Sequence, residues 1–281
     1  QRYANTTMIY RDEQSGELSG LSRVRSITLD DAHVFCRADQ VAAELESVWQ
    51  IIIALYKKVG FNDLQIRLSF RDPETPKKYL GDELVWKRAE DDLTKLAKSK
   101  NVKYSVAPGE AAFYGPKIDF MARDSLNRLW QLATIQLDMN LPKRFDLNFT
   151  NSEGKEEQVV MIHAAIMGSI ERFLSVLIEH YAGNFPFWLA PVQIKLLPVS
   201  EKFVNYTKTV QELLIENGIR SETDDASETL GKRIRNAELE KLPYMAIIGE
   251  KEQKDKTVTI RSRHSAKQEV VKLTKILKTL K

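Results

Sequence analysis

Apolar residues in the first 100 positions recur at helical spacing, then at strand spacing, then at helical spacing again. Residues 39–60 and 82–98 place an apolar side chain every three or four positions. This predicts two amphipathic helices, the first capped by Asp39 and ended by Gly60. Between them, residues 64–70 alternate apolar and polar positions, which predicts a half-buried strand.

Two more alternating segments, residues 117–122 and 130–138, follow with a short turn between them. Strict alternation places Gln131 on the face opposite Thr134, or near an edge of the sheet. Successive strands joined by short turns favour an antiparallel sheet.

The most apolar segment is residues 159–183, which predicts a short strand through Ile162 followed by a helix that ends at Gly183. A helix that is apolar on every side is expected to be buried against the sheet. Its one interior cation, Arg172, then requires a partner, because an isolated buried charge is costly. A salt bridge with Glu171 or another acid is one explanation.

The character of the chain changes after a segment rich in proline and aromatic residues, 185–193. Strands and helices then alternate and finish in a helix expected over residues 266–281, which is typical of a small α/β domain with a mostly parallel sheet. The predicted organisation is therefore an α+β domain of residues 1–189, in which helices flank an antiparallel sheet, followed by a smaller α/β domain of residues 190–281.

Composition restricts which class of protein this can be, but it says little about the chemistry of the protein. The chain has 281 residues, 43% of them hydrophobic and 29% charged. The sequence contains no apolar run long enough to cross a bilayer, and no signal peptide is found in it. Its single cysteine, Cys36, excludes an internal disulfide framework and fits a reducing compartment, so we expect a cytoplasmic protein. The net charge of +3 permits a nucleic-acid partner without requiring one. Because Gln1 leads straight into an extended segment, we expect a fragment of a longer chain.

Charged residues gather in the sequence YRDEQSGELSGLSRVRSITLDDAHVFC, residues 10–36. Two extended segments joined by a polar loop would bring cations together with a carboxylate and an imidazole. Arginine offers a two-pronged fork to phosphate, so the set suits a nucleoside triphosphate and a small polar substrate. For any single Arg-x-Glu pair the simpler explanation is a solvent-facing hairpin. The residues that carry this interpretation are Arg11, Glu13, Arg23, Asp31 and His33.

This stretch resembles motif 2 of class II aminoacyl-tRNA synthetases in the form found in threonyl-tRNA synthetases. Later segments match the same family in the same order: VMIH at residues 160–163, GSIERF at 168–173 as motif 3, and FPFWLAPVQ as the junction to an anticodon-binding domain. The resemblance implies activation of threonine by ATP and transfer to tRNA(Thr). Family members form homodimers through motif 1, which is not found in this chain.

The resemblance also implies roles for individual residues on the ATP side of the site, with Mg²⁺ accompanying ATP. Arg11 would hold the α-phosphate and the substrate carboxylate, and Arg23 the outer phosphates. Arg172 would stack on the base. The remaining expected contacts are Glu13 and Ser22 at the adenine, Gln136 and Ser169 at the ribose, and Lys117 and Gln131 beside the reacting groups.

His33 and His163 match the two histidines that bind zinc in the family. Taken alone, each is more often a hydrogen-bonded core residue, and their separation in the sequence gives no information about a metal. The resemblance implies Zn²⁺ bound by these two residues and by a cysteine that lies upstream of motif 2, outside this chain. Cys36 is a poor substitute. The resemblance further implies that Asp31, Tyr114 and Thr134 form the threonine pocket, and ligation of the substrate hydroxyl would reject valine.

Four positions depart from the family pattern and are expected to weaken turnover. Ile27 and Leu29 replace an aromatic residue and an amide, Leu132 replaces a cysteine, and Ala164 replaces an arginine. Two alternatives therefore stay open, a non-catalytic RNA-binding or regulatory relative and a ligase for another amino acid.

In the smaller domain, four residues match positions that read the threonine anticodon in the family. Arginine and glutamate can bond the base edges of splayed single-stranded loops. Each residue taken alone could equally be an ordinary surface group, but together they favour RNA contact. They are Ser227, Arg235, Glu252 and Arg261.

Overall fold

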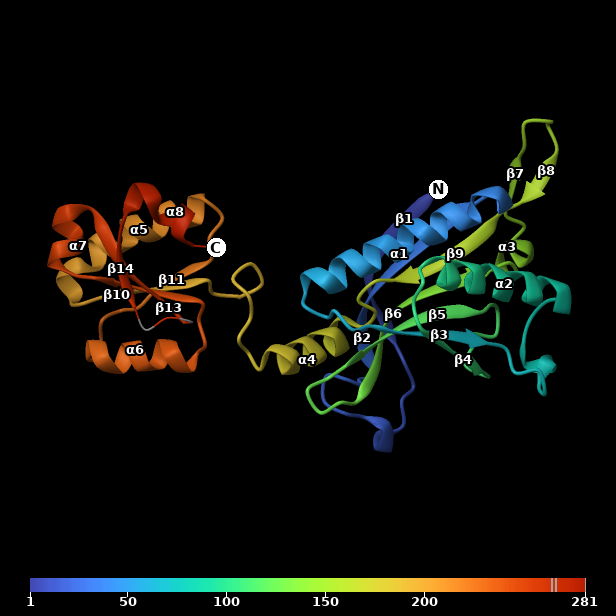
Figure 1. Cartoon of the computed structure of the whole chain (residues 1–281), viewed down its shortest axis with the longest axis horizontal. Coiled ribbons are helices and arrows are strands. Elements are labelled where there is room, and N and C mark those ends of the chain that lie inside the picture. The colour runs from blue at the N-terminus through green and yellow to red at the C-terminus, as the bar shows by residue number, and fades with distance from the viewer. Residues whose placement is uncertain (264, 266, 281) are drawn as a thin grey trace. The chain divides into compact units, whose positions relative to one another are not determined.

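The computed structural model describes residues 1–263, 265 and 267–280, and these form two compact units that divide between Glu179 and His180. The boundary predicted from the sequence, between residues 189 and 190, falls in the connection that follows the last helix of unit 1 (Figure 1). None of the helices in the described residues is long and apolar enough to cross a membrane.

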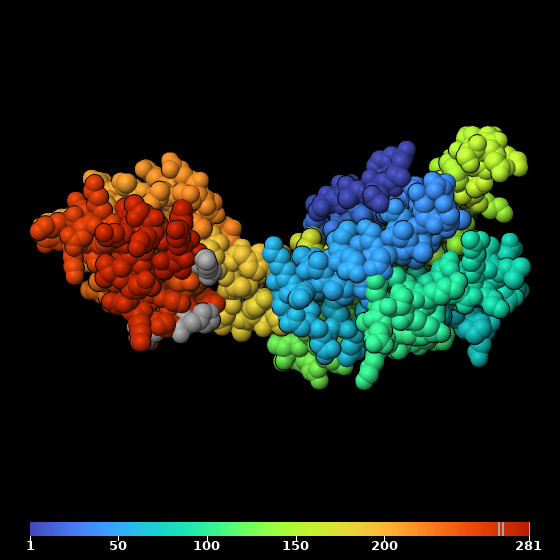
Figure 2. Space-filling model, turned by 45° about the horizontal axis from the view of Figure 1, so that its top comes forward, coloured from blue at the N-terminus to red at the C-terminus, as the bar shows by residue number. Residues whose placement is uncertain are grey.

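Unit 1 is built on a seven-stranded sheet. Its strands are β1 (Arg2–Tyr10), β2 (Ser26–Cys36), β3 (Gln65–Phe70), β4 (Tyr104–Pro108), β5 (Lys117–Arg123), β6 (Leu129–Asp138) and β9 (Val160–Ala165). They lie in the order β1-β2-β9-β6-β5-β3-β4, and every neighbouring pair is antiparallel except β3 and β4. The predicted antiparallel sheet is confirmed. A separate hairpin, β7 (Asn148–Thr150) and β8 (Glu156–Gln158), projects from the unit in yellow-green in Figure 2.

Two long helices cover one face of this sheet (Figure 1). The helices of unit 1 are α1 (Val41–Lys58), α2 (Glu83–Ser99), the short α3 (Leu141–Arg144) and α4 (Ile170–Tyr181). Trp49 of α1 meets Phe120 of β5 edge to face, with 4.9 Å between ring centroids, inside a core of fully buried side chains such as Leu68 and Ile135. Since side chains alternate along each strand, the neighbours of these core residues point to the opposite face, which carries the polar groups.

Three details of the prediction for unit 1 are wrong. Asp39 lies in a 3₁₀ turn, Ala38–Gln40, ahead of α1 and does not cap it. The sequence predicts Arg11 and Glu13 at the end of the first extended segment and Arg23 and Arg25 on the second, but β1 stops at Tyr10 and β2 starts at Ser26, so all four belong to the connecting loop. Helix α4 is buried on one side only, because Phe173, Val176 and Leu177 are buried whereas Leu174 and Ile178 are 43% and 46% exposed.

Unit 2 combines a five-stranded sheet with helices. The elements are β10 (Ile194–Pro198), α5 (Val204–Glu216), β11 (Ser221–Thr223), α6 (Leu230–Leu239), β12 (Tyr244–Ile248), α7 (Glu250–Asp255), β13 (Thr257–Ser262), β14 (Gln268–Lys272) and α8 (Ile276–Thr279). The order is β11-β10-β12-β13-β14; β10 is parallel to both its neighbours, and β13 is antiparallel to both of its own. The α/β class is confirmed, although half of the strand pairs are antiparallel.

The helix predicted over residues 266–281 is wrong for most of its length. Gln268–Lys272 forms β14 instead, in which Val271 is buried and Val270 is exposed, and only Ile276–Thr279 is α-helical. A stretch of five residues with a single buried side chain is compatible with both helical and strand spacing. Its pairing with β13 makes it a strand. Residues 266 and 281, at the ends of the predicted helix, lie outside the described residues.

Candidate active site

The loop between β1 and β2 carries four of the seven predicted ATP-binding residues, Arg11, Glu13, Ser22 and Arg23. Arg23 forms ion pairs with Glu13 (Nη2 to Oε2, 2.8 Å) and with Glu17 (Nη2 to Oε1, 3.1 Å). Arg25 donates from Nε to the Glu13 carbonyl at 2.9 Å, which fixes the backbone of the loop. The hydrogen bond from Arg23 lowers the pKa of Glu13. The Arg11 side chain makes no hydrogen bond or ion pair with any described residue, so its guanidinium remains free for a ligand.

The segment before α4 is held against β2 by a single carboxylate. Asp30 accepts from the backbone N–H groups of Ile166, Met167 and Gly168 at 2.8, 2.9 and 2.6 Å. Ser169 follows directly and forms a bridge with Leu29 of β2. This anchoring determines where the first turn of α4 begins.

Arg172, in that first turn, lies over the ring of Trp130 with 5.6 Å between its Cζ and the ring centroid. Its Nε donates to the Ser22 carbonyl at 2.8 Å, and Nη1 donates to the Gln131 carbonyl at 3.4 Å. Burial lowers the pKa of Arg172, and the nearby Arg11 lowers it further.

The salt bridge between Arg172 and Glu171, one explanation offered for the buried cation, is not formed. Glu171 instead accepts from the Thr28 backbone N–H at 2.9 Å and from the Ser169 hydroxyl at 3.0 Å. Arg172 has carbonyl and aromatic partners and no acidic one among the described residues. A cation held in this way keeps its charge available to an anionic ligand.

These groups surround one cleft, here named the arginine cleft. It is lined by Arg11, Glu13, Ser22, Arg23, Val24, Ile27, Leu29, Gln131, Leu132, Thr134, Ala165, Gly168, Ser169 and Arg172. Six of the seven predicted ATP-binding residues line it; the seventh, Gln136, does not. Three arginines and one glutamate make the cleft electropositive, which suits phosphate groups.

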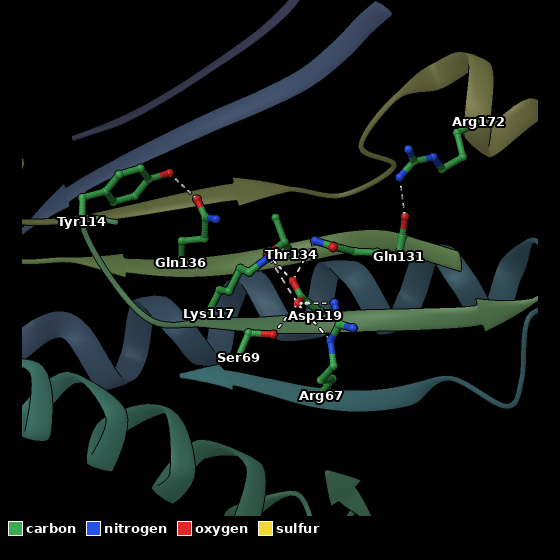
Figure 3. A network of polar contacts seen from close by, with 9 residues as sticks. All are labelled: Arg67, Ser69, Tyr114, Lys117, Asp119, Gln131, Thr134, Gln136 and Arg172. Atoms are coloured by element: carbon green, nitrogen blue, oxygen red, sulfur yellow. Dashed lines mark hydrogen bonds and ion pairs between the residues drawn. The ribbon is translucent and has the colours of Figure 1, made fainter. Parts of the chain in front are cut away.

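Next to the arginine cleft lies a carboxylate that the sequence reasoning did not assign. Asp119 of β5 is completely buried and accepts hydrogen bonds at 2.7 Å from the Gln131 amide and at 3.1 Å from the Thr134 hydroxyl (Figure 3). Lys117 lies 3.4 Å from it. The signal in the sequence was an acid inside an otherwise apolar strand, which requires donors around it.

Gln131 shares a face with Thr134, so the expectation of opposite faces is wrong. Strand register places Phe120 opposite Ala133 but Met121 opposite Gln131, so β6 carries one extra residue at this point. A bulge of this kind shifts the alternation and turns the following side chain to the other face. It brings Gln131 to Asp119 and into the arginine cleft.

The two predicted zinc histidines are neighbours at the other end of the same polar face. His33 of β2 pairs with His163 of β9, and their ring centroids are 4.7 Å apart. His163 Nε2 lies 2.9 Å from Oδ2 of the buried Asp138, and Asp31 lies 3.8 Å from His33 Nδ1. Burial lowers the pKa of His33.

Tyr114 completes this group, here named the histidine cluster, which consists of His33, His163, Asp31, Asp138 and Tyr114. Its hydroxyl donates to Gln136 Oε1 at 2.6 Å, and its ring lies 5.0 Å from that of His163 (Figure 3 shows the Tyr114–Gln136 pair). Burial raises the pKa of Tyr114 to about 12. Gln136, predicted at the ribose, is therefore found with the predicted threonine pocket.

The donor set for zinc is incomplete. A catalytic zinc site has three protein ligands, whereas His33 and His163 supply two. Among the described residues, no group of three or more His, Cys, Asp or Glu is arranged to hold a metal. Cys36 lies three positions after His33 on β2, so it points to the other face, and burial raises the pKa of its thiol to about 11. The two histidines alone do not fit a catalytic zinc centre.

Three of the four departures from the family pattern line the arginine cleft, and the fourth does not. Ile27, Leu29 and Leu132 line it, and Ile27 and Leu132 are 7% and 4% exposed. Ala164 is buried, pairs with Ala32 and Ile135, and alternates with His163, so it faces the helices. The expectation that Ala164 is a pocket position is therefore wrong.

In unit 2, two of the four predicted RNA-binding residues, Glu252 and Arg261, have side-chain partners on neighbouring elements. Glu252 accepts from the Thr259 hydroxyl at 2.6 Å and from the Gly249 N–H at 2.9 Å. Arg261, two residues along β13 on the same face as Thr259, pairs with Glu238 of α6 at 2.7 Å. Arg235 is exposed one turn earlier on α6, and the exposed Ser227 lies in the loop before that helix.

Comparison with known proteins assigns both units. Residues 1–181 match the family described as tRNA synthetase class II core domain (G, H, P, S and T), and residues 193–281 match the anticodon binding domain. Threonine–tRNA ligases from Chlorobium phaeobacteroides and Deinococcus radiodurans are 49% and 47% identical over 260 and 262 residues. These alignments cover 92% and 93% of this chain, which spans about 40% of the length of either relative.

A solved structure agrees with this assignment. The RNA binding domain of threonyl-tRNA synthetase from Cryptosporidium parvum superposes with a TM-score of 0.93 at 39% identity, covering 99% of this chain and 69% of that one. The chain therefore belongs to the threonyl-tRNA synthetase family of class II aminoacyl-tRNA synthetases, of which it carries the core and the anticodon-binding domain.

Proposed function

We propose that this chain binds ATP in the arginine cleft, joins it to threonine as threonyl-adenylate and serves the transfer of threonine to tRNA(Thr). The observation that carries the proposal is the continuity of one polar face. The arginine cleft, Asp119 and the histidine cluster follow one another on the face of the sheet that the helices leave open.

Adenylate formation requires two anions to be held in line while charge develops on the α-phosphate. Arg11, whose side chain has no hydrogen-bond or ion-pair partner among the described residues, is free to bridge the α-phosphate and the threonine carboxylate. Arg23 is oriented by two carboxylates and can turn its remaining N–H groups to the outer phosphates. Bound Mg²⁺ would supply further charge neutralisation at the phosphates.

Arg172 suits the adenine end of the nucleotide. Its guanidinium lies over the ring of Trp130, and a guanidinium in this place can also stack on a planar ligand. Glu13 remains ionised beside Arg23 and can accept from an amino group of the base. Ser169 and Ser22, at the same end of the cleft, offer hydroxyl groups to the nucleotide.

Threonine would lie between Asp119 and the histidine cluster. Asp31 can accept from the substrate hydroxyl, Tyr114 and Thr134 bound the pocket, and Lys117 lies beside the reacting carboxylate. Zinc at His33 and His163 remains a prediction that requires a third ligand.

We further propose that turnover is weak, because Ile27 and Leu29 present apolar surface where hydrogen-bonding or stacking groups would hold the nucleotide and substrate. The same observation supports the second candidate, a synthetase-derived RNA-binding protein without catalysis. Unit 2 would then contact the anticodon through Arg235, Arg261 and Ser227.

The test is ATP–pyrophosphate exchange with threonine, serine or valine, with zinc added or chelated. Threonine-dependent exchange that falls at least 100-fold in Arg11→Ala, but not in the surface control Arg37→Ala, supports ligase activity. No exchange with any amino acid, in a chain that still binds tRNA(Thr), favours the second candidate.

A further inference from the structure

A buried carboxylate lies at the turn between β5 and β6, outside the arginine cleft. Asp124 directly follows β5, and its side chain is completely buried. Its Oδ1 accepts from the backbone N–H groups of Leu126 and Arg128 at 3.0 and 2.8 Å. Its Oδ2 accepts from two side chains, Trp130 Nε1 at 2.8 Å and Arg128 Nε at 2.6 Å. One oxygen thus holds the backbone of the turn, and the other holds two side chains.

Both side chains held by Oδ2 meet helix α4. The guanidinium Cζ of Arg172 lies 5.6 Å from the centroid of the Trp130 ring, and that of Arg128 lies at the same distance. Arg128 also reaches Glu179, seven positions after Arg172 on the same face of α4, with Nη2 3.4 Å from Oε2. Asp124 is therefore linked to the arginine cleft mainly through Trp130, since an exposed ion pair such as that of Arg128 contributes little.

The orientation of the Trp130 ring constrains the Arg172 guanidinium. Arg172 donates to two carbonyls, those of Ser22 and Gln131, at 2.8 and 3.4 Å, and the second bond is drawn in Figure 3. The ring supplies the third contact of the guanidinium, across its face. An indole has a single N–H donor, so its bond to Asp124 selects one orientation of the ring.

Asp124 acts as an acceptor on both oxygens. Burial raises the pKa of its carboxyl group, but the hydrogen bonds from Trp130 and Arg128 outweigh burial and lower the pKa overall. An ionised carboxylate only accepts hydrogen bonds, so each of the four donors around it has a fixed partner. The ring that meets Arg172 is therefore held by a group that cannot reverse its role.

We propose that Asp124 is a positioning residue for ATP, which fixes the Trp130 ring and, through it, the Arg172 guanidinium that meets the base. The inference rests on the proposed function, because it concerns the adenine end of the nucleotide in the arginine cleft. It assigns Asp124 no contact with the nucleotide, since its effect passes through the ring.

Asp124→Asn separates the two tasks of the carboxylate. The backbone N–H groups of the turn have fixed directions, so the remaining oxygen is expected to face them and the new NH₂ to face Trp130 Nε1. Two donors then meet, and the ring loses its preferred orientation while the turn is kept. The variant therefore tests the hold on the ring rather than the fold of the turn.

The experiment measures, by titration calorimetry, the Kd of ATP and of inorganic triphosphate, which lacks the base. Because Arg172 meets the base whereas Arg11 and Arg23 meet the phosphates, loss of the ring orientation should weaken ATP alone. In Asp124→Asn, the preference for ATP over triphosphate should fall at least threefold, while the Kd of triphosphate changes less than twofold. In the matched control Asp72→Asn, which alters a carboxylate that holds another turn, the preference should fall less than twofold.

A double-variant cycle tests whether the effect passes through the ring. Trp130→Phe keeps an aromatic ring beside Arg172 but offers no N–H to the carboxylate. In this background, Asp124→Asn should lower the preference for ATP less than twofold, because the contact that it removes is already absent.

Several results would overturn the inference. They are a fall below threefold in Asp124→Asn, and a fall of twofold or more either in Asp72→Asn or when Asp124→Asn is added to Trp130→Phe. Equal weakening of both ligands together with a lower Tm would indicate a merely structural role and would also overturn it, as would the absence of any preference for ATP in the unaltered chain. The expected binding pattern without any exchange would refute the proposed activity and leave the inference standing, because binding needs no turnover.

Discussion

Removing the Asp30 carboxylate should release the segment that positions Ser169 and Arg172. In Asp30→Ala, three backbone N–H groups lose their acceptor, which they approach at 2.6–2.9 Å. A hydrogen bond to a charged group contributes about 1.5–3 kcal/mol. Because the site is half-buried and water can replace part of the loss, we expect a total of about 3 kcal/mol.

Urea unfolding followed by tryptophan fluorescence measures this loss. With an m-value on the order of 2–3 kcal/mol per molar urea, the midpoint for unit 1 should fall by about 1 M. Asp30→Asn keeps one acceptor oxygen, so its urea midpoint should lie between those of the unaltered chain and Asp30→Ala. The exposed Asp12→Ala is the matched control. A loss below about 0.5 kcal/mol in Asp30→Ala would refute the reasoning, since it would mean that the N–H groups find equivalent partners.

The same residue predicts a pH dependence. Burial raises the pKa of Asp30 in the folded chain above its ordinary value, more than the three N–H groups lower it. Between the unfolded and the folded pKa, the folded state then holds more protons, so its stability falls as pH rises through this window and is constant above it. The stability of the unaltered chain relative to Asp30→Asn should therefore shrink as pH rises above the ordinary pKa of an aspartate. A difference that grows with pH would show that the N–H bonds outweigh burial.

Three further changes test other parts of the structure. Trp130→Leu should raise the Kd for ATP about 2- to 10-fold through the lost contact with Arg172, while calorimetry shows unchanged threonine binding; an equal loss for both ligands would contradict the contact. Gly168→Ala should lower Tm by roughly 5 °C, because a Cβ would lie 2.4 Å from the Leu132 carbonyl oxygen at a φ of +69°, and an unchanged Tm by calorimetry would refute this strain. Glu252→Ala should cost unit 2 about 1–2 kcal/mol in urea unfolding, because the Gly249 N–H and the Thr259 hydroxyl lose their acceptor; a loss of tRNA affinity at unchanged stability would instead favour base reading.

Much of the architecture could be predicted because it depends on local periodicity. Apolar residues at helical spacing specify α1 and α2, and alternation specifies β3, β5 and β6, with boundaries within a few residues of those observed. The last segment could not be predicted in this way. A short stretch such as Gln268–Lys272 is compatible with both helical and strand spacing, and its pairing with the preceding strand β13 decided the outcome.

The sequence by itself determined which residue types are available, their order and the family they resemble, since the motifs are contiguous strings. The tertiary structure decided which of them meet. One extra residue in β6 moved Gln131 to the face of Thr134, and pairing of β9 with β2 and β6 turned Ala164 into the core beside His163. The partners of Arg172 and the donors around Asp119 come from strands and loops far apart in the chain. Strand alternation follows from backbone geometry that every sequence shares, whereas bulges, registers and the partners of buried charges depend on packing across the sheet, which no local pattern encodes.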